Sequence, residues 1–183
     1  MFRSLLSSTL LCASALVAEQ LDNIEFTLPE IASEWEANRT VNNDYGSAIL
    51  FFPKDTPETA FHSHAFDSFY SDDDDDSSYY FHAMFYKTPY DPETDAAQVE
   101  AQLSLLLPSL DYQFYLVDQA DDFSTFEFYA FDDFGFSLYG VMRKMRSENG
   151  TVTLTYCTDD EELVPLARRA GLAALKHCHA LTP

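Results

Sequence analysis

The chain has 183 residues, with 31 acidic and 10 basic side chains, and therefore a formal net charge of −21 at pH 7. So negative a balance repels nucleic acid and anionic membrane surfaces, which argues against both classes of partner and favours basic protein surfaces or cations. Hydrophobic residues make up 46% of the sequence and aromatic residues 15%, which supports a sizeable core and argues against a disordered acidic protein.

The first 18 residues have the pattern of a secretory signal peptide. Arg3 precedes a short apolar run, which ends among small residues between Ala13 and Ala18. Small side chains suit the signal-peptidase site, and the run is shorter than the roughly 20 residues that cross a bilayer. Cleavage after Ala18 is our first choice and cleavage after Ala15 our second. We therefore expect a secreted or periplasmic protein whose residues 19–183 form a single α+β domain.

The first half of this domain predicts strands separated by an acidic loop. Apolar and polar residues alternate over Ile24–Leu28, and a second apolar stretch covers Ala48–Phe52; each reads as a strand that a proline ends. Thr56-Pro57-Glu58 has the form of a helix start. Residues 71–78 hold five consecutive aspartates, whose mutual repulsion predicts a loop. Tyr79–Tyr86 is apolar on both faces, which indicates a strand covered on both sides.

The second half predicts a helix, four strands in hairpin order and a closing helix. Asp91-Pro92-Glu93 opens the first helix and Pro108 ends it, with Val99, Leu103 and Leu106 on one side. The strands are Tyr112–Val117, Thr125–Phe131, Phe136–Arg146 and Thr151–Cys157. The closing helix runs from near Glu161 to about His179, and its core-facing stripe is Leu163, Leu166, Ala167, Ala170 and Ala174. This order predicts an α+β sandwich in which helices cover an antiparallel sheet.

Three segments carry a resemblance to a known group. These are Ala48–Lys54, the hairpin from Tyr139–Arg143 to Ser147–Tyr156, and the closing alanine-rich helix. Together they resemble a group of small, uncharacterised exported proteins of gram-negative bacteria, whose order of elements is similar to the PsbP-like α/β/α sandwich. The resemblance implies a fold and export, and it brings no active site with it. The run Asp72–Asp76 is not part of the shared pattern.

Two groups of residues are weak candidates for metal binding. Asp72, Asp73, Asp74, Asp75 and Asp76 could attract Ca²⁺, which takes six to eight oxygen ligands. Adjacent carboxylates cannot all converge on one ion, so a solvated loop is the alternative interpretation. His62 and His64 would share a face only in a strand, whereas this stretch reads as helical or irregular. We therefore predict no cofactor, with Ca²⁺ as the alternative.

Two cysteines, Cys157 and Cys178, remain after signal-peptide removal. Cys157 precedes the predicted helix start by about four residues, which can span only about 14 Å. The helix carries Cys178 about 25 Å from that start, at about 1.5 Å per residue. A disulfide needs its Cα atoms within about 7 Å. We therefore predict that the two cysteines are not bonded to each other.

The sequence contains no recognisable catalytic signature, so the leading interpretation is an exported, non-catalytic binding or accessory protein. Its partner would be a basic protein surface or a cluster of cations. Exposed aromatic residues from Tyr79–Tyr86 or Tyr112–Tyr115 would anchor that partner. One alternative is a small exported enzyme with a cleft of acids and of His62, His64 or His82. The other is a cation-binding protein that uses Asp72–Asp76.

Overall fold

The computed structural model describes residues 18–29, 35–43, 46–53, 79–106, 110–133 and 137–181. Several predicted features lie outside the described residues. They are the signal peptide up to residue 17, the helix start at Thr56, the acidic segment 71–78 with Asp72–Asp76, and the two histidines His62 and His64.

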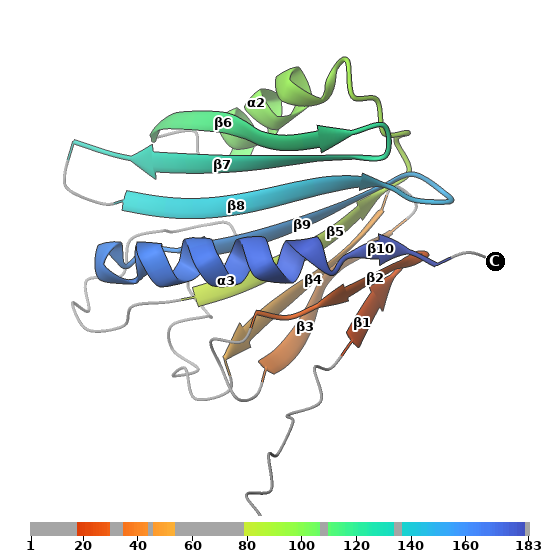
Figure 1. Cartoon of the computed structure of the whole chain (residues 1–183), viewed down its shortest axis with the longest axis horizontal. Coiled ribbons are helices and arrows are strands. Elements are labelled where there is room, and N and C mark those ends of the chain that lie inside the picture. The colour runs from red at the N-terminus through yellow and green to blue at the C-terminus, as the bar shows by residue number, and fades with distance from the viewer. Residues whose placement is uncertain are drawn as a thin grey trace, which may run out of the picture.

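A seven-stranded antiparallel sheet dominates the fold, in the order β3-β4-β5-β9-β8-β7-β6 (Figure 1). Its strands are β3 (Trp35–Asn43), β4 (Gly46–Pro53), β5 (Tyr79–Tyr86), β6 (Asp111–Ala120), β7 (Phe123–Phe131), β8 (Ser137–Arg146) and β9 (Thr151–Thr158). The strand predictions are confirmed, including the hairpin order of the last four. Strand β9 lies in the middle and is buried along its whole length, as expected of a strand covered on both faces.

One face of the sheet is covered by a helix and by a second, smaller sheet. Helix α3 (Val164–Lys176) follows the 3₁₀ turn η1 (Glu161–Leu163) and packs on β8 and β9. Beside it lies a three-stranded sheet of β1 (Ala18–Leu21), β2 (Ile24–Thr27) and β10 (His179–Ala180). Phe26 of β2 packs against Phe51 and Phe81 of the large sheet. The prediction that helices cover the sheet is therefore incomplete, because strands cover part of this face.

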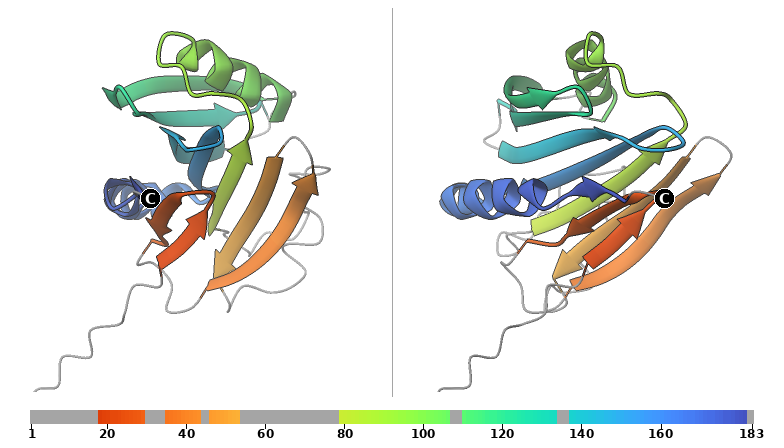
Figure 2. Two further views of the ribbon diagram at one scale, coloured as in Figure 1. Left: turned by 90° about the vertical axis from the view of Figure 1, so that its right-hand side faces the viewer. Right: turned by 45° about the vertical axis from the view of Figure 1, so that its right-hand side comes forward.

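The opposite face carries helix α2 (Asp95–Leu106) over β7 and β8, and Figure 2 shows α2 and α3 on opposite sides of the sheet. Val99 and Leu103 face the core as predicted, and both are buried. The helix begins four residues later than predicted. Asp91 instead closes a preceding turn, in which its carboxylate accepts hydrogen bonds from the Glu93 amide and the Thr94 hydroxyl.

A buried ion pair fastens α2 to the sheet. Lys144 Nζ on β8 lies 2.5 Å from Asp95 Oδ1 at the start of the helix, and both side chains are almost fully buried. The same ammonium donates to Gln98 Oε1 at 3.0 Å. Removing either charge would leave the other buried without a counter-ion, which typically costs 3–5 kcal/mol.

Helix α3 is shorter than predicted, because it begins at Val164 and ends at Lys176. Its buried side is made by Ala167, Gly171, Ala174 and Leu175. Leu166, assigned to the core from sequence, is 36% exposed. Leu166 lies about 100° from Ala167 around the helix, on the side away from Leu175, and therefore outside the buried arc.

The C-terminal end of α3 is anchored by the buried Arg143 of β8. Its Nη1 donates to the carbonyl of Leu175 at 2.6 Å and its Nε donates to Thr125 Oγ1 at 2.8 Å. The guanidinium also lies over the Phe123 ring, 4.3 Å from the centroid. A positive charge at this point complements the negative end of the helix dipole.

The two cysteines of the described chain, Cys157 and Cys178, are both buried, and they form no disulfide with each other. Cys157 belongs to the hydrophobic cluster beneath α2, whereas Cys178 belongs to the cluster beneath α3. The sheet lies between them, which is a stronger obstacle to a disulfide than the helix length used in the prediction. Among the described residues, no helix is long and apolar enough to cross a membrane.

Candidate binding groove

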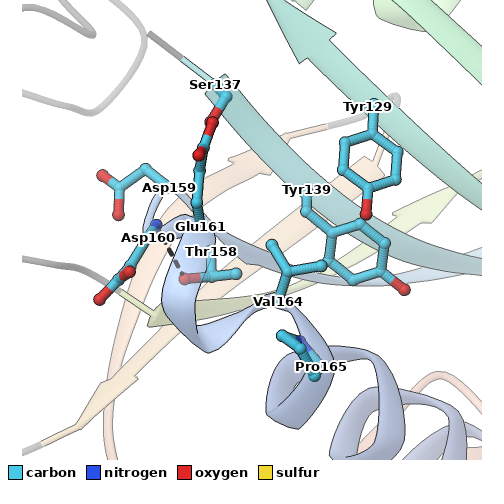
Figure 3. A pocket seen from close by; sticks show the side chains of 9 residues that line it. All are labelled: Tyr129, Ser137, Tyr139, Thr158, Asp159, Asp160, Glu161, Val164 and Pro165. Atoms are coloured by element: carbon cyan, nitrogen blue, oxygen red, sulfur yellow. Dashed lines mark hydrogen bonds between the residues drawn. The ribbon is translucent and has the colours of Figure 1, made fainter.

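A groove opens where β8 begins and β9 ends, under the first turn of α3 (Figure 3). It encloses about 290 Å³. Two tyrosines from neighbouring strands form one side, and the acidic segment that leads into α3 forms the other. The lining residues are Tyr129, Ser137, Tyr139, Thr158, Asp159, Asp160, Glu161, Val164 and Pro165.

The aromatic side of the groove comes from a directly opposed pair on β7 and β8. Tyr129 and Tyr139 are register partners, so their side chains point to the same face of the sheet. Their ring centroids are 5.0 Å apart with the planes tilted by 59°. Tyr139 is buried and forms the base, while Tyr129 is 41% exposed and presents its ring to solvent.

Glu127 links Tyr139 of this pair to Arg168 of helix α3. It lies two residues before Tyr129 on β7 and accepts two hydrogen bonds from the Arg168 guanidinium, each of 2.9 Å. The Tyr139 hydroxyl also donates to Glu127 Oε2, at 3.4 Å. Burial and then the Glu127 charge raise the pKa of Tyr139 well above its ordinary value, so this phenol stays neutral at physiological pH.

The acidic side of the groove is held in place by short-range hydrogen bonds. Asp160 Oδ1 accepts from the Glu162 amide at 2.8 Å and so caps η1. Glu161 Oε1 accepts from the Ser137 hydroxyl at 3.1 Å, which links η1 to the start of β8. Carboxylates next to an exposed tyrosine ring suit a cation, because both the charge and the ring face attract it.

Exposed aromatic side chains continue from the groove onto the uncovered end of the same sheet face. Phe131 lies two residues after Tyr129 on β7, and Tyr115 on β6 is the register partner of Glu127. The exposed fraction is 40% for Phe131 and 57% for Tyr115. We call Tyr115, Tyr129 and Phe131 the aromatic shelf.

The structure shows which of the aromatic and histidine candidates predicted from sequence are exposed and which are buried. Tyr79–Tyr86 is mostly core, since Phe81, Ala83 and Met84 are buried, whereas Tyr112–Tyr115 contributes Tyr115 to the shelf. Burial lowers the pKa of His82 on β5 to about 4. Its register partners are Leu50 and Thr155, so no carboxylate stands directly across from it on either neighbouring strand. In the described ranges, no three His, Cys, Asp or Glu side chains gather into a metal-binding group.

Sequence reasoning did not find the groove. Its acidic residues precede the closing helix directly, so they read as ordinary first-turn acids that complement the helix dipole. Only the strand register brings them beside Tyr129 and Tyr139. The available sequence signal was the alternation that places Tyr129 and Phe131 on one face of β7.

No protein-family model and no curated protein matches the chain. Among solved structures, the chain is similar to cyanobacterial PsbP (CyanoP) from Synechocystis sp. PCC 6803. The two share 9% sequence identity at a TM-score of 0.56, over 97% of this chain and 99% of the other. The chain has a PsbP-like fold. This confirms the fold that the resemblance in sequence implies. A sequence identity of 9% shows the fold alone.

Proposed function

We propose that this protein is an exported, non-catalytic binding or accessory protein, and that its groove and aromatic shelf receive a basic partner. The observation that carries the proposal is the combination of an exposed aromatic surface with an acidic rim. Tyr129 belongs to both the groove and the shelf, and Asp159, Asp160 and Glu161 line the groove beside it. Export rests on the signal-peptide pattern of residues 1–18.

The two parts of this surface would have different roles. Exposed carboxylates act at long range and contribute little at contact, so they raise the association rate. Partly buried aromatic rings supply contact area and usually hold most of the binding energy of an interface. On this proposal the acidic segment Asp72–Asp76 adds to the long-range attraction, while Tyr129 anchors the partner.

The test uses the full chain and a defined probe. The probe is a seven-residue peptide with lysine and valine in alternation, and a matched peptide has glutamate in place of lysine. We expect calorimetry to detect binding of the lysine peptide and no binding of the glutamate peptide. The substitution Tyr129→Ser should weaken lysine-peptide binding about tenfold, which is the effect of losing about 1.4 kcal/mol.

The control is Ala97→Ser, an exposed position on α2 at the opposite face. It should bind the lysine peptide as the wild type does, because Ala97 lies away from the groove. Neither Ala97→Ser nor Tyr129→Ser changes the net charge, so the two variants differ only in the loss of the tyrosine ring. Equal affinity of wild type and Tyr129→Ser for the lysine peptide would mean that the groove is not the anchor.

A further inference from the structure

Strand β6 is an edge strand of the large sheet. It is the last strand in the sheet order, and within the described ranges it pairs with β7 alone. It is 10 residues long, and Figure 1 shows it at the upper edge of the sheet, next to α2. An edge strand directs half of its N–H and C=O groups away from its neighbour, where they can pair with another chain.

Apolar side chains are exposed on both faces of this edge. Tyr115 is 57% exposed, Leu116 52% and Val117 44%. Consecutive residues of a strand point to opposite faces, so a strand laid beside β6 would find apolar contacts above and below the sheet. The pairing with β7 shifts register between Leu116 and Asp118, which leaves Asp111–Leu116 as the regular segment.

The charged side chains that this edge segment itself contributes are all acidic. Residues 111–122 hold Asp111, Asp118, Asp121 and Asp122 and contain no lysine or arginine. Edge strands are commonly protected by lysine, which would repel a basic segment, and that protection is absent from this strand. A second copy of the chain would instead bring two acidic edges together, each on a molecule of net charge −21.

We propose that β6 receives an extended basic segment of the partner, which pairs with Asp111–Leu116 as an eighth strand of the sheet. This inference rests on the proposed function and names the partner's conformation. Main-chain hydrogen bonds to the edge would supply affinity. Side chains on one face of the added strand would lie next to Tyr115, which is part of the aromatic shelf. Basic side chains would lie near Asp111 and, just beyond the paired segment, near Asp118, whose carboxylate is also 3.9 Å from Arg143 Nη2.

The test uses the lysine–valine peptide and two N-methylated analogues of it. Each analogue carries methyl groups on alternate backbone nitrogens, so each blocks the hydrogen-bond donors along one edge of the peptide only. We expect one analogue to lose at least tenfold in affinity and the other to bind as the parent does. In the bound protein, amides within residues 111–116 should exchange more slowly with solvent.

A pair of protein variants provides a second measurement. Leu116→Lys and Ala97→Lys each add one positive charge at an exposed position. Leu116→Lys should weaken parent-peptide binding at least fivefold, while Ala97→Lys should change it less than twofold. Both positions are at the surface, so circular dichroism is expected to show both variants folded.

The outcomes separate the two proposals. If both analogues bind as the parent does and Tyr129→Ser still weakens binding, the groove is the anchor and strand addition is wrong. If the parent peptide does not bind at all, both proposals fail. If the protein instead forms dimers that Leu116→Lys abolishes, the occupant of the edge is a second copy and the present inference is overturned.

Discussion

At the scale of single residues, burial makes His82 a source of acid sensitivity. Its pKa falls to about 4 from an ordinary value of 6.5. Below pH 6.5 the His82 imidazole is protonated in the unfolded chain, whereas in the folded chain it stays neutral until about pH 4. The stability contribution is therefore present above pH 6.5 and is lost as the pH falls from 6.5 towards 4, by about 3 kcal/mol at most.

Replacing His82 should flatten this part of the stability profile. We expect His82→Gln to lose less stability than wild type between pH 7 and pH 4, by urea unfolding at each pH. The slope of the free energy of unfolding against pH is the quantity to compare, because the substitution also changes packing, and this effect is the same at every pH. His179→Gln, at a histidine whose side chain is 58% exposed, is the control. Parallel profiles for wild type and His82→Gln would contradict the prediction.

Two buried threonines of the sheet should respond in opposite ways to the same substitution. Thr153 Oγ1 is buried and has no hydrogen-bond partner among the described residues, so Thr153→Val should be neutral or stabilise the fold by up to about 1 kcal/mol. Thr125 Oγ1 accepts from the buried Arg143, so Thr125→Val should destabilise it by about 2 kcal/mol. Urea midpoints measure both, and an equal loss in Thr153→Val would show that its hydroxyl has a partner such as bound water.

At the scale of elements, the contact between α3 and the sheet depends on Gly171. A Cβ at this position would lie 2.7 Å from Cδ1 of the Tyr156 ring, which is buried in the core. Overpacking of this kind costs about 1–3 kcal/mol, while alanine in place of glycine favours a helix by about 1 kcal/mol. Gly171 therefore sets how closely the helix approaches β9.

We expect Gly171→Ala to lower the free energy of unfolding by about 1 kcal/mol, despite the higher helix propensity of alanine. Arg169→Ala, at an exposed position of the same helix, is the control and should stay within about 0.5 kcal/mol of wild type. Chemical denaturation measures both. A stabilised Gly171→Ala variant would mean that the helix and the Tyr156 ring can move apart without loss.

At the scale of the whole molecule, the net charge should make stability depend on salt. The full chain carries −21, and folding brings these like charges together. Salt screens them over about 8 Å at physiological strength and about 3 Å at 1 M. We expect a higher urea midpoint in 1 M NaCl than at low ionic strength. A midpoint that stays constant or falls would show that opposing ion pairs, such as Arg168–Glu127, outweigh the general repulsion.

The sequence by itself determined strands β2, β4, β5 and β6 to β9 and the two helices α2 and α3, but not strands β1, β3 and β10. Alternating apolar residues, prolines and turn residues are local signals, and they located β5 and β9 and the hairpins from β6 to β9 to within a few residues. The helical period also predicted the burial of Val99, Leu103 and Ala167 correctly, whereas its prediction for Leu166 was wrong. The starts of both helices were less well predicted, because acids near a helix start suit several neighbouring positions equally well.

The tertiary structure alone decided which surfaces remain open. The small sheet of β1, β2 and β10 joins both ends of the chain, and no local pattern states that these segments pair. Tyr86 and Tyr115 both belong to aromatic strand segments, yet Tyr86 is largely covered and Tyr115 is exposed, because β5 lies inside the sheet and β6 at its edge. Burial depends on which strands become neighbours, and pairing between distant segments is set by the packing of the whole chain.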